Sequence, residues 1–350
     1  MKAQPLLELR DLSVEFATRR GRARVLEQLS FSVAEGATLG IVGESGSGKS
    51  VTSLAIMGLL SDSAKVSGEV FWRGRGISAL SEHEMQRLRG REMAMIFQDP
   101  MTSLNPSFSI GFQLRESITT HLNATNSKRT QLSREAVDLR ACELLTQVGI
   151  SDPRGRLQAY PHQFSGGMAQ RVMIAMALAS RPRLLIADEP TTALDVTIQA
   201  QILSLLKRLQ RENGMALILV SHDLGVVAEN TENLIVMYAG QAVEMGRTRD
   251  LLREPRHPYT QGLLACSPAQ HGLSEFRTRL KSISGQVPDL VHRPSGCQFY
   301  ARCDRHEARC LASAPVLKSL AGERAVRCVL AETEAENEAR TVAGRSGARP

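Results

Sequence analysis

The segment that most constrains the fold of this chain is Gly43–Ser50, with the sequence GESGSGKS. A short apolar run of strand character, residues 38–42, precedes it, and residues 50–60 after it show helical apolar spacing. A strand, a glycine-rich loop and a helix in this order form a cradle whose backbone N–H groups bind nucleotide phosphates. The sequence therefore predicts an α/β protein in which Lys49 holds the outer phosphates and Ser50 binds Mg²⁺.

A second glycine-rich segment, residues 164–170 with the sequence FSGGMAQ, also has the character of a helix start. The free amide donors at the N-terminus of a helix are a natural phosphate site. This segment carries no lysine, however. We therefore expect it to contact a nucleotide that is held by another subunit.

Two further strands are expected to deliver polar groups to the same nucleotide. An apolar run ends in Asp188 and Glu189, and a later one, residues 215–220, is followed by His222. Ligands of open α/β sheets bind at the carboxyl ends of strands. Asp188 is expected to hold Mg²⁺ through water, Glu189 to face the attacking water, and His222 to contact the γ-phosphate. The alternative for Asp188 and Glu189 is a buried strand that simply ends in polar residues. The alternative for His222 is an ordinary loop histidine.

In their order, these motifs resemble those of ATP-binding cassette (ABC) ATPases over residues 1 to about 260. One position departs from the family pattern, because Phe164 stands where leucine usually opens the signature segment. The resemblance implies ATP and Mg²⁺ as ligands, with Glu189 and His222 as catalytic residues. It further implies an adenine contact by Phe16, Mg²⁺ binding by Ser50, Gln98 and Asp188, and ATP binding by Gly43, Glu44, Ser45, Gly46, Ser47, Gly48 and Lys49. Across a head-to-tail dimer it implies signature contacts by Ser165, Gly166, Gly167 and Gln170, and a D-loop at residues 193–195 that includes Asp195.

The same resemblance sets the expected organisation of the chain. Residues 1–260 are expected to form an ABC ATPase domain, built from a RecA-like core, an antiparallel β part and a helical subdomain at about residues 99–182. Several prolines after residue 254 mark a change of character. They open a small cysteine-rich extension, residues 261–330, and residues 331–350 lack apolar periodicity and are expected to be disordered.

A narrower resemblance, to the ATPases of dipeptide and oligopeptide importers and among them to the D-type subunits, rests on four segments and on the extension. The segments are residues 98–106 (QDPMTSLNP), 160–163 (YPHQ), 187–195 (ADEPTTALD) and 256–260 (RHPYT). The resemblance implies ATP-driven peptide import at the cytoplasmic face of a bacterial inner membrane. The implied partners are a second ATPase subunit, two transmembrane permease subunits and an extracytoplasmic peptide-binding protein.

Other functions stay open at this point. Importers of nickel or glutathione share most of these motifs. Soluble ABC ATPases that act on DNA or ribosomes usually fuse two cassettes or carry long inserts, which this sequence lacks. A regulatory cassette that binds ATP without hydrolysis is disfavoured because Glu189 and His222 are both present.

Four of the six cysteines, Cys297, Cys303, Cys310 and Cys328, lie in the extension, whereas Cys142 and Cys266 have the setting of core residues. A cytosolic ATPase is not expected to keep disulfides. Structural zinc prefers closer pairs than these, and wider gaps suit a larger cluster. Spacing alone leaves an iron–sulfur cluster, zinc and chance clustering open. The family resemblance implies a four-iron, four-sulfur (4Fe–4S) cluster, with Zn²⁺ as the alternative.

Charge and hydropathy bound the remaining possibilities. The net charge is +7, and one dense basic cluster, residues 19–24, is expected at a hairpin tip near a phospholipid surface or an ATP. No set of aromatic residues accompanies it, so nucleic acid is not an expected partner. The longest uninterrupted apolar run, residues 172–179, is far shorter than the ~20 residues that a membrane helix needs. The first residues also lack a signal-peptide core, so any transmembrane path is expected to come from other subunits.

Overall fold

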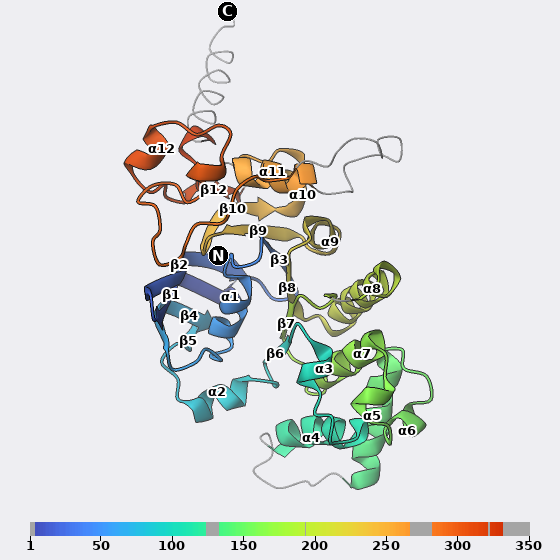
Figure 1. Ribbon diagram of the computed structural model, residues 1–350. Helices are drawn as coiled ribbons and strands as arrows, with labels where there is room; N and C mark the ends of the chain where they lie inside the picture. The colour runs from blue at the N-terminus through green and yellow to red at the C-terminus, as the bar shows by residue number, and fades with distance from the viewer. Residues whose placement is uncertain (1–3, 124–132, 193, 267–281, 321–322, 332–350) are drawn as a thin grey trace, which may run out of the picture.

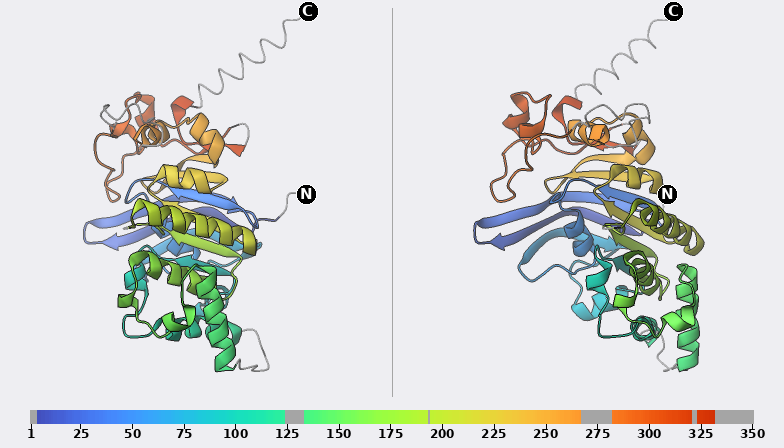
Figure 2. Two further views of the ribbon diagram at one scale, coloured as in Figure 1. Left: turned by 90° about the vertical axis from the view of Figure 1, so that its right-hand side faces the viewer. Right: turned by 45° about the vertical axis from the view of Figure 1, so that its right-hand side comes forward.

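The structure, a computed structural model, describes residues 4–123, 133–192, 194–266, 282–320 and 323–331. Two β-sheets are stacked as layers, and a group of helices lies at one end of the larger sheet (Figures 1 and 2). The C-terminal segments lie at the opposite end of the molecule from these helices (Figure 1).

The smaller sheet is antiparallel and has the strand order β2-β1-β4-β5. Along its longest pairing, side chains alternate between buried and exposed, so that Leu7, Leu9 and Val14 face the core. The basic cluster lies at the turn between the first two strands, as a hairpin tip, and Arg24 forms ion pairs with Glu15 and Glu27. The strands are β1 (Leu7–Thr18), β2 (Gly21–Val33), β4 (Ala64–Trp72) and β5 (Arg75–Gly76).

The larger sheet has eight strands in the order β11-β12-β10-β9-β3-β8-β7-β6. Strands β9, β3, β8, β7 and β6 run parallel, whereas the last three strands of the chain add to one edge in antiparallel fashion. The strands are β3 (Thr38–Val42), β6 (Met93–Ile96), β7 (Leu184–Asp188), β8 (Ala216–Ser221), β9 (Asn233–Tyr238), β10 (Gln241–Arg247), β11 (Lys318–Ser319) and β12 (Ala325–Val326).

The parallel strands are buried on both faces, so their sequences are continuous apolar runs rather than alternating ones. Successive residues nevertheless enter different cores. Ile186 and Ile218 pack toward the antiparallel sheet, whereas Leu185 and Leu217 pack toward the helices. Packing on both faces holds the central strands in place, and the parallel neighbours β3, β8 and β7 end at the same edge of the sheet.

Between β6 and β7 the chain is helical and packs as one group against the end of the sheet (Figure 1). Polar caps start several of these helices, and Ser133 and Ser165 each accept a hydrogen bond from the first turn. The helices are α3 (Pro100–Ser103), α4 (Ile110–Asn123), α5 (Arg134–Gln147), α6 (Pro153–Arg156), the 3₁₀ turn η1 (Pro161–Gln163) and α7 (Gly166–Ala177).

The remaining helices connect strands or belong to the C-terminal part. Helix α8 begins at an Asp195 cap and ends at Gly214, whose left-handed conformation closes the helix. These helices are α1 (Lys49–Ile56), α2 (Glu82–Leu88), α8 (Val196–Asn213), α9 (Leu224–Asn230), α10 (Thr248–Arg253), α11 (Pro258–Cys266), the 3₁₀ turn η4 (Tyr300–Arg302) and α12 (Arg309–Ala312). The division at residue 260 stays a prediction, and the expected tail lies almost wholly outside the described residues, which end at 331.

Candidate functional site

The phosphate-binding loop lies between β3 and α1, as the sequence predicts. Its backbone is closely confined by neighbouring chain. A Cβ added at Gly43 would lie 2.2 Å from the carbonyl oxygen of Met237, and one at Gly48 would lie 2.9 Å from that of Val25. Both contacts are too short for any side chain, so only glycine fits at these two positions.

Lys49 is buried at the start of α1, with its ammonium directed back into the loop. Its Nζ donates to the carbonyl oxygens of Gly43 at 2.7 Å and Glu44 at 3.0 Å. Burial lowers the pKa of Lys49, and the negative charges of Glu189, Asp188 and Glu44 oppose this shift. The arrangement holds a cation beside the loop, and no carboxylate among the described residues forms an ion pair with it.

Ser50 and Asp188 meet across the space between α1 and the end of β7. The Ser50 hydroxyl donates to Oδ1 of Asp188 at 3.2 Å. Burial raises the pKa of Asp188, and the Ser50 hydrogen bond opposes this effect. A hydroxyl and a carboxylate next to a phosphate loop are hard oxygen donors of the kind that Mg²⁺ prefers.

Glu189 is the point at which three neighbouring strands of the sheet bring polar side chains together. Its Oε2 accepts from Gln98 Nε2 at 3.3 Å and from Thr192 Oγ1 at 2.8 Å, and lies 3.2 Å from His222 Nδ1. Gln98 follows β6, Glu189 follows β7, and His222 follows β8. The backbone of Glu189 has a φ of 45°, which is uncommon for a residue with a side chain. Backbone strain of this kind is concentrated at functional sites.

The second glycine-rich segment starts helix α7, also as expected, and Ser165 and Gly166 are exposed there. In Figure 1 helix α7 lies in the group of helices at the end of the larger sheet. Gly167 and Gln170 are buried instead. A Cβ at Gly167 would lie 2.6 Å from Ile198, so this glycine allows α7 to pack against α8. The structure thus separates the four predicted signature residues into two exposed and two buried ones.

The structure gives no contact between the phosphate loop and the residues predicted to bind adenine or to form the D-loop, among the residues that it describes. Phe16 is half-buried on β1 and packs against the core between the two sheets. Asp195 caps α8 by accepting from the Ile198 N–H at 2.9 Å. Within the expected D-loop, residue 193 lies outside the described residues. The adenine and D-loop roles therefore stay predictions.

Sequence reasoning missed two groups that the structure brings to the site. Thr192 donates to Glu189, and its place three residues after Glu189 in a turn is a signal that could have indicated it. Arg302 forms an ion pair with Glu44 of the phosphate loop, at 2.6 Å. No local pattern indicates this second contact, because 258 residues separate the two side chains.

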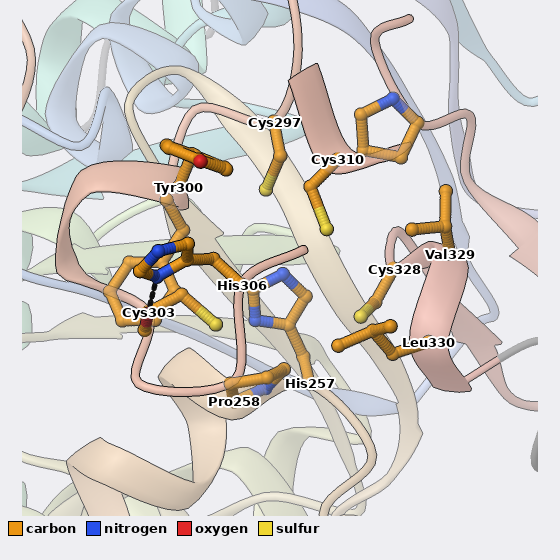
Figure 3. A pocket seen from close by; sticks show the side chains of 12 residues that line it. His257, Pro258, Cys297, Tyr300, Cys303, His306, Cys310, Cys328, Val329 and Leu330 are labelled. Carbon is orange, nitrogen blue, oxygen red and sulfur yellow. Dashed lines mark hydrogen bonds between the residues drawn. The ribbon is translucent and has the colours of Figure 1, made fainter. Parts of the chain in front are cut away.

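The prediction of an iron–sulfur cluster is wrong for this structure. The four cysteines of the extension line one small cavity together with His257 and His306 (Figure 3). Over the described parts of the chain, however, no group of three or more His, Cys, Asp or Glu side chains is arranged to hold a metal ion. Burial raises the pKa of Cys297 to about 11 and also raises the pKa values of Cys303 and Cys328. The structure gives zinc no support either, because the same absence of a metal-holding group among the described residues applies to it.

The geometry of the loop fits a nucleotide and its Mg²⁺. The buried hydroxyl of Ser47 has no hydrogen-bond partner within the described chain, and it lies in a loop closed by glycines and the Lys49 cation. A phosphate oxygen is a suitable acceptor for such groups. The parallel sheet, the loop and the acidic ends of β7 together define a P-loop nucleotide-binding ATPase.

Comparisons with known proteins narrow the class. The family model described as ABC transporter matches residues 26–192, and the model described as oligopeptide/dipeptide transporter, C-terminal region, matches residues 243–310. The dipeptide transport ATP-binding protein DppD of Escherichia coli is 51% identical over 324 residues, which are 92% of this chain and 96% of that protein. DppD of Haemophilus influenzae is 50% identical over 92% of this chain and 94% of its own length. The chain therefore belongs to the ABC transporter ATPases, in the group that carries the oligopeptide/dipeptide C-terminal region.

Solved structures of ABC cassettes have a similar fold. The ATP-binding cassette MJ0796, solved as a dimer in a post-hydrolysis state with ADP and Pi, has a TM-score of 0.61 and 28% identity, covering 69% of this chain and 99% of that one. CbiO1 of Clostridium perfringens has a TM-score of 0.59 and 25% identity, covering 72% of this chain and 92% of its own. In the portion of the chain that the structure describes, no helix is both long and apolar enough to cross a membrane.

Proposed function

We propose that this chain hydrolyses ATP as one of two ATPase subunits of a membrane importer for dipeptides or oligopeptides. The observation that carries the proposal is the convergence of Gln98, Thr192 and His222 on Glu189, at the end of the strand next to the phosphate loop. Close similarity to dipeptide transport ATPases supports the choice of substrate.

Each side chain of the site has a part in hydrolysis. Lys49 binds the outer phosphates, and Ser50 and Asp188 would hold Mg²⁺, directly or through water. When bound, Mg²⁺ neutralises charge that develops on the phosphate oxygens. Glu189 orients the attacking water and accepts its proton. Gln98, Thr192 and His222 fix the position of the Glu189 carboxylate, and His222 is exposed enough to contact the γ-phosphate as well.

A partner subunit would complete the site. Ser165 and Gly166 are exposed at the start of α7, and the first N–H groups of a helix have no partner within the helix. A second ATPase subunit packed head to tail would place these groups on the nucleotide held by Lys49. The positive end of the helix dipole, equivalent to roughly half a charge, favours the phosphate there.

Permease subunits would bind near the start of α4. Phe97, Met101, Phe108 and Phe112 are each more than 40% exposed, and the last two rings stack with centroids 4.5 Å apart. Tyr160 is also exposed, and the residue before it contacts the start of α4, where the Ile110 N–H donates to the carbonyl oxygen of Ala159 at 2.8 Å. Exposed apolar side chains such as the stacked rings of Phe108 and Phe112 mark a surface that binds another protein. The chain would thus be peripheral, at the cytoplasmic face of a bacterial inner membrane, with a peptide-binding protein acting from the other side.

The proposal is tested with the chain, its partner ATPase and the permease subunits in liposomes or nanodiscs. We expect slow ATP hydrolysis by the isolated chain and a large increase on assembly, with import of a labelled dipeptide by proteoliposomes. Equal specific activity of the dilute chain alone would contradict the composite site. Hydrolysis that drives import of nickel or glutathione, but not of peptides, would contradict the substrate.

The permease contact has its own test. Phe112→Glu is expected to prevent assembly with the permease, while nucleotide binding by the chain stays unchanged. Leu139→Glu, at an exposed position on α5, is the matched control and is expected to assemble normally. Normal assembly of the Phe112 variant would place the permease elsewhere.

A further inference from the structure

One acidic residue, Glu44, lies inside a loop that must bind an anion. Its backbone N–H donates to the hydroxyl of Tyr259 at 2.9 Å, and its carbonyl oxygen accepts from Lys49 Nζ at 3.0 Å. The carboxylate would repel the phosphates of a nucleotide unless a cation neutralises it. The structure supplies that cation from the C-terminal part of the chain.

Arg302, in the 3₁₀ turn η4, binds both carboxylate oxygens of Glu44. The two N–H groups donate at 2.6 Å and 2.9 Å, in the parallel geometry that makes arginine–carboxylate pairs strong. Only 5% of the Arg302 side chain is exposed. The paired carboxylate raises the pKa of Arg302 further, so the guanidinium is charged at every accessible pH.

The guanidinium of Arg302 is itself held from several sides. It donates to the carbonyl oxygens of Ile283 at 3.1 Å and Ser284 at 2.9 Å. It also lies over the rings of Tyr238 and Phe299, at 5.7 Å and 6.0 Å from their centroids. The position of Arg302 is therefore fixed by the fold and does not depend on Glu44 alone.

An aromatic cluster joins this arginine to the body of the protein. Tyr238 ends β9, Tyr259 lies on α11, and Phe299 precedes η4. Their ring centroids are 4.7 to 5.3 Å apart, and all three side chains are buried. Tyr259 contacts both this cluster and the Glu44 backbone, so the loop and the C-terminal region share one packing unit.

We propose that Arg302 is a positioning residue for the phosphate-binding loop. It neutralises Glu44 and holds it away from the bound phosphates, so that the C-terminal region sets the affinity of the loop for ATP and ADP. This inference rests on the proposed nucleotide binding by Gly43–Ser50. Removing one partner of a buried ion pair leaves an uncompensated charge, and here that charge would lie beside the nucleotide.

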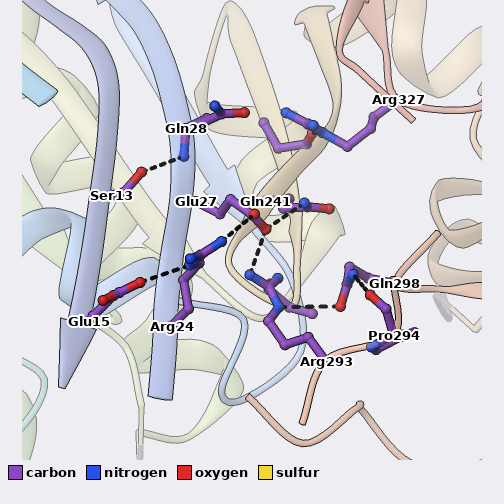
Figure 4. A network of polar contacts seen from close by, with 12 residues as sticks. Ser13, Glu15, Arg24, Glu27, Gln28, Gln241, Arg293, Pro294, Gln298 and Arg327 are labelled. Atoms are coloured by element: carbon purple, nitrogen blue, oxygen red, sulfur yellow. Dashed lines mark hydrogen bonds and ion pairs between the residues drawn. The ribbon is translucent and has the colours of Figure 1, made fainter. Parts of the chain in front are cut away.

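The same C-terminal segment provides a matched control. Arg293 donates to Oε2 of Glu27 at 2.6 Å and contacts Gln298, and only 11% of its side chain is exposed (Figure 4). This second, partly buried pair fastens the segment to β2, and neither of its members belongs to the phosphate loop. Arg293→Met therefore removes an ion pair of the same C-terminal segment, while Glu27 keeps its ion pair with Arg24 and no charge of the phosphate loop is left unpaired.

The test is a double-mutant cycle on the full chain, with MgATP and MgADP titrated by calorimetry. Arg302→Met is expected to weaken both affinities by about 10- to 100-fold. In the Glu44→Gln background the same change is expected to cost less than about threefold, because no carboxylate is left unpaired. Arg293→Met should change the affinities by less than about threefold.

The outcomes separate the inference from the function on which it rests. If Arg302→Met binds nucleotide as well as the original chain, or if Glu44→Gln does not reduce the loss, Arg302 only packs and the inference fails. If the original chain binds neither nucleotide, the proposed function fails instead. Should Arg302→Met not fold, the neutral polar pair Arg302→Gln and Arg302→Gln/Glu44→Gln decides the matter by the same comparison. In the assembled transporter, the KM for ATP should rise more than kcat falls.

Discussion

The two glycine-rich segments of this chain differ in how completely the chain itself surrounds them. In the phosphate loop, a Cβ added at Gly43 or Gly48 would lie 2.2 or 2.9 Å from a backbone oxygen, and Lys49 and Glu44 are held by hydrogen bonds or ion pairs. At the start of α7, Ser165 and Gly166 are exposed, and a Cβ at Gly166 would meet its nearest neighbour, Leu194, at 3.4 Å. The phosphate loop is closely enclosed by its own chain, whereas the start of α7 is open to contact by a second subunit, as the proposed function requires. Changes at the first should therefore act within one subunit, and changes at the second only in a dimer.

The largest expected effect concerns ATP hydrolysis at the nucleotide site next to the phosphate loop. Glu189→Gln in the assembled transporter is expected to reduce ATP hydrolysis by about 10²–10⁴-fold, because the general base is lost. MgATP binding should persist, because Lys49 and the loop are unchanged. Steady-state ATPase assays and equilibrium binding check the two statements. The partner's own site must be silenced, and a rate equal to that of the original complex would remove Glu189 from the role of base.

A change at the exposed start of α7 should reduce ATP hydrolysis by the dimer without changing nucleotide binding by the chain that carries the change. Gly166→Asp places a negative charge where the partner's phosphate is expected, and should reduce hydrolysis in the dimer by about 10²–10³-fold. The affinity of the isolated chain for MgATP should change by less than about threefold. Gly166→Ala is the control, since it adds a methyl group without charge. Weaker binding by the isolated Gly166→Asp chain would break the distinction between the two sites.

Alanine substitutions should lower the free energy of unfolding by different amounts in the phosphate loop and at the start of α7. Gly43→Ala is expected to lower the free energy of unfolding by about 1–3 kcal/mol, because its Cβ cannot avoid the Met237 carbonyl. Gly166→Ala should change this free energy by less than about 1 kcal/mol, since alanine is favourable in a helix. Urea unfolding of both variants provides the measurement. Equal destabilisation by the two substitutions would show that the phosphate loop and the start of α7 do not differ in how closely the chain surrounds their glycines.

The smallest expected effect concerns Gln170, which the sequence places with the exposed signature residues and the structure buries. Its side-chain Nε2 has no hydrogen-bond partner in the described part of the chain. Replacing a buried polar group of this kind by an apolar one of similar shape is nearly neutral. Gln170→Met should therefore change the free energy of unfolding by less than about 1 kcal/mol. A large loss of hydrolysis at unchanged stability would return Gln170 to a role across the dimer interface.

The cysteine-rich region shows how far spacing can mislead. The gaps between Cys297, Cys303, Cys310 and Cys328, read with the family resemblance, predicted an iron–sulfur cluster. The fold does bring the four thiols to one cavity, but the arrangement is not one that holds a metal. Ligand geometry and thiol ionisation depend on burial and on side-chain direction, and neither is written in the spacing of a sequence.

The sequence by itself determined the features that depend on local backbone chemistry. Gly43–Ser50 must form its loop between a strand and a helix, because glycine spacing and apolar runs act over a few residues. The acidic end of β7 follows from the same local pattern. Only the tertiary structure decided which groups meet across long separations. Glu189 gains Gln98 and His222 because β6, β7 and β8 are parallel neighbours, and Glu44 gains Arg302 because the C-terminal region packs on the aromatic side chains behind the loop. Such pairs depend on how whole layers pack, so no short stretch of residues encodes them.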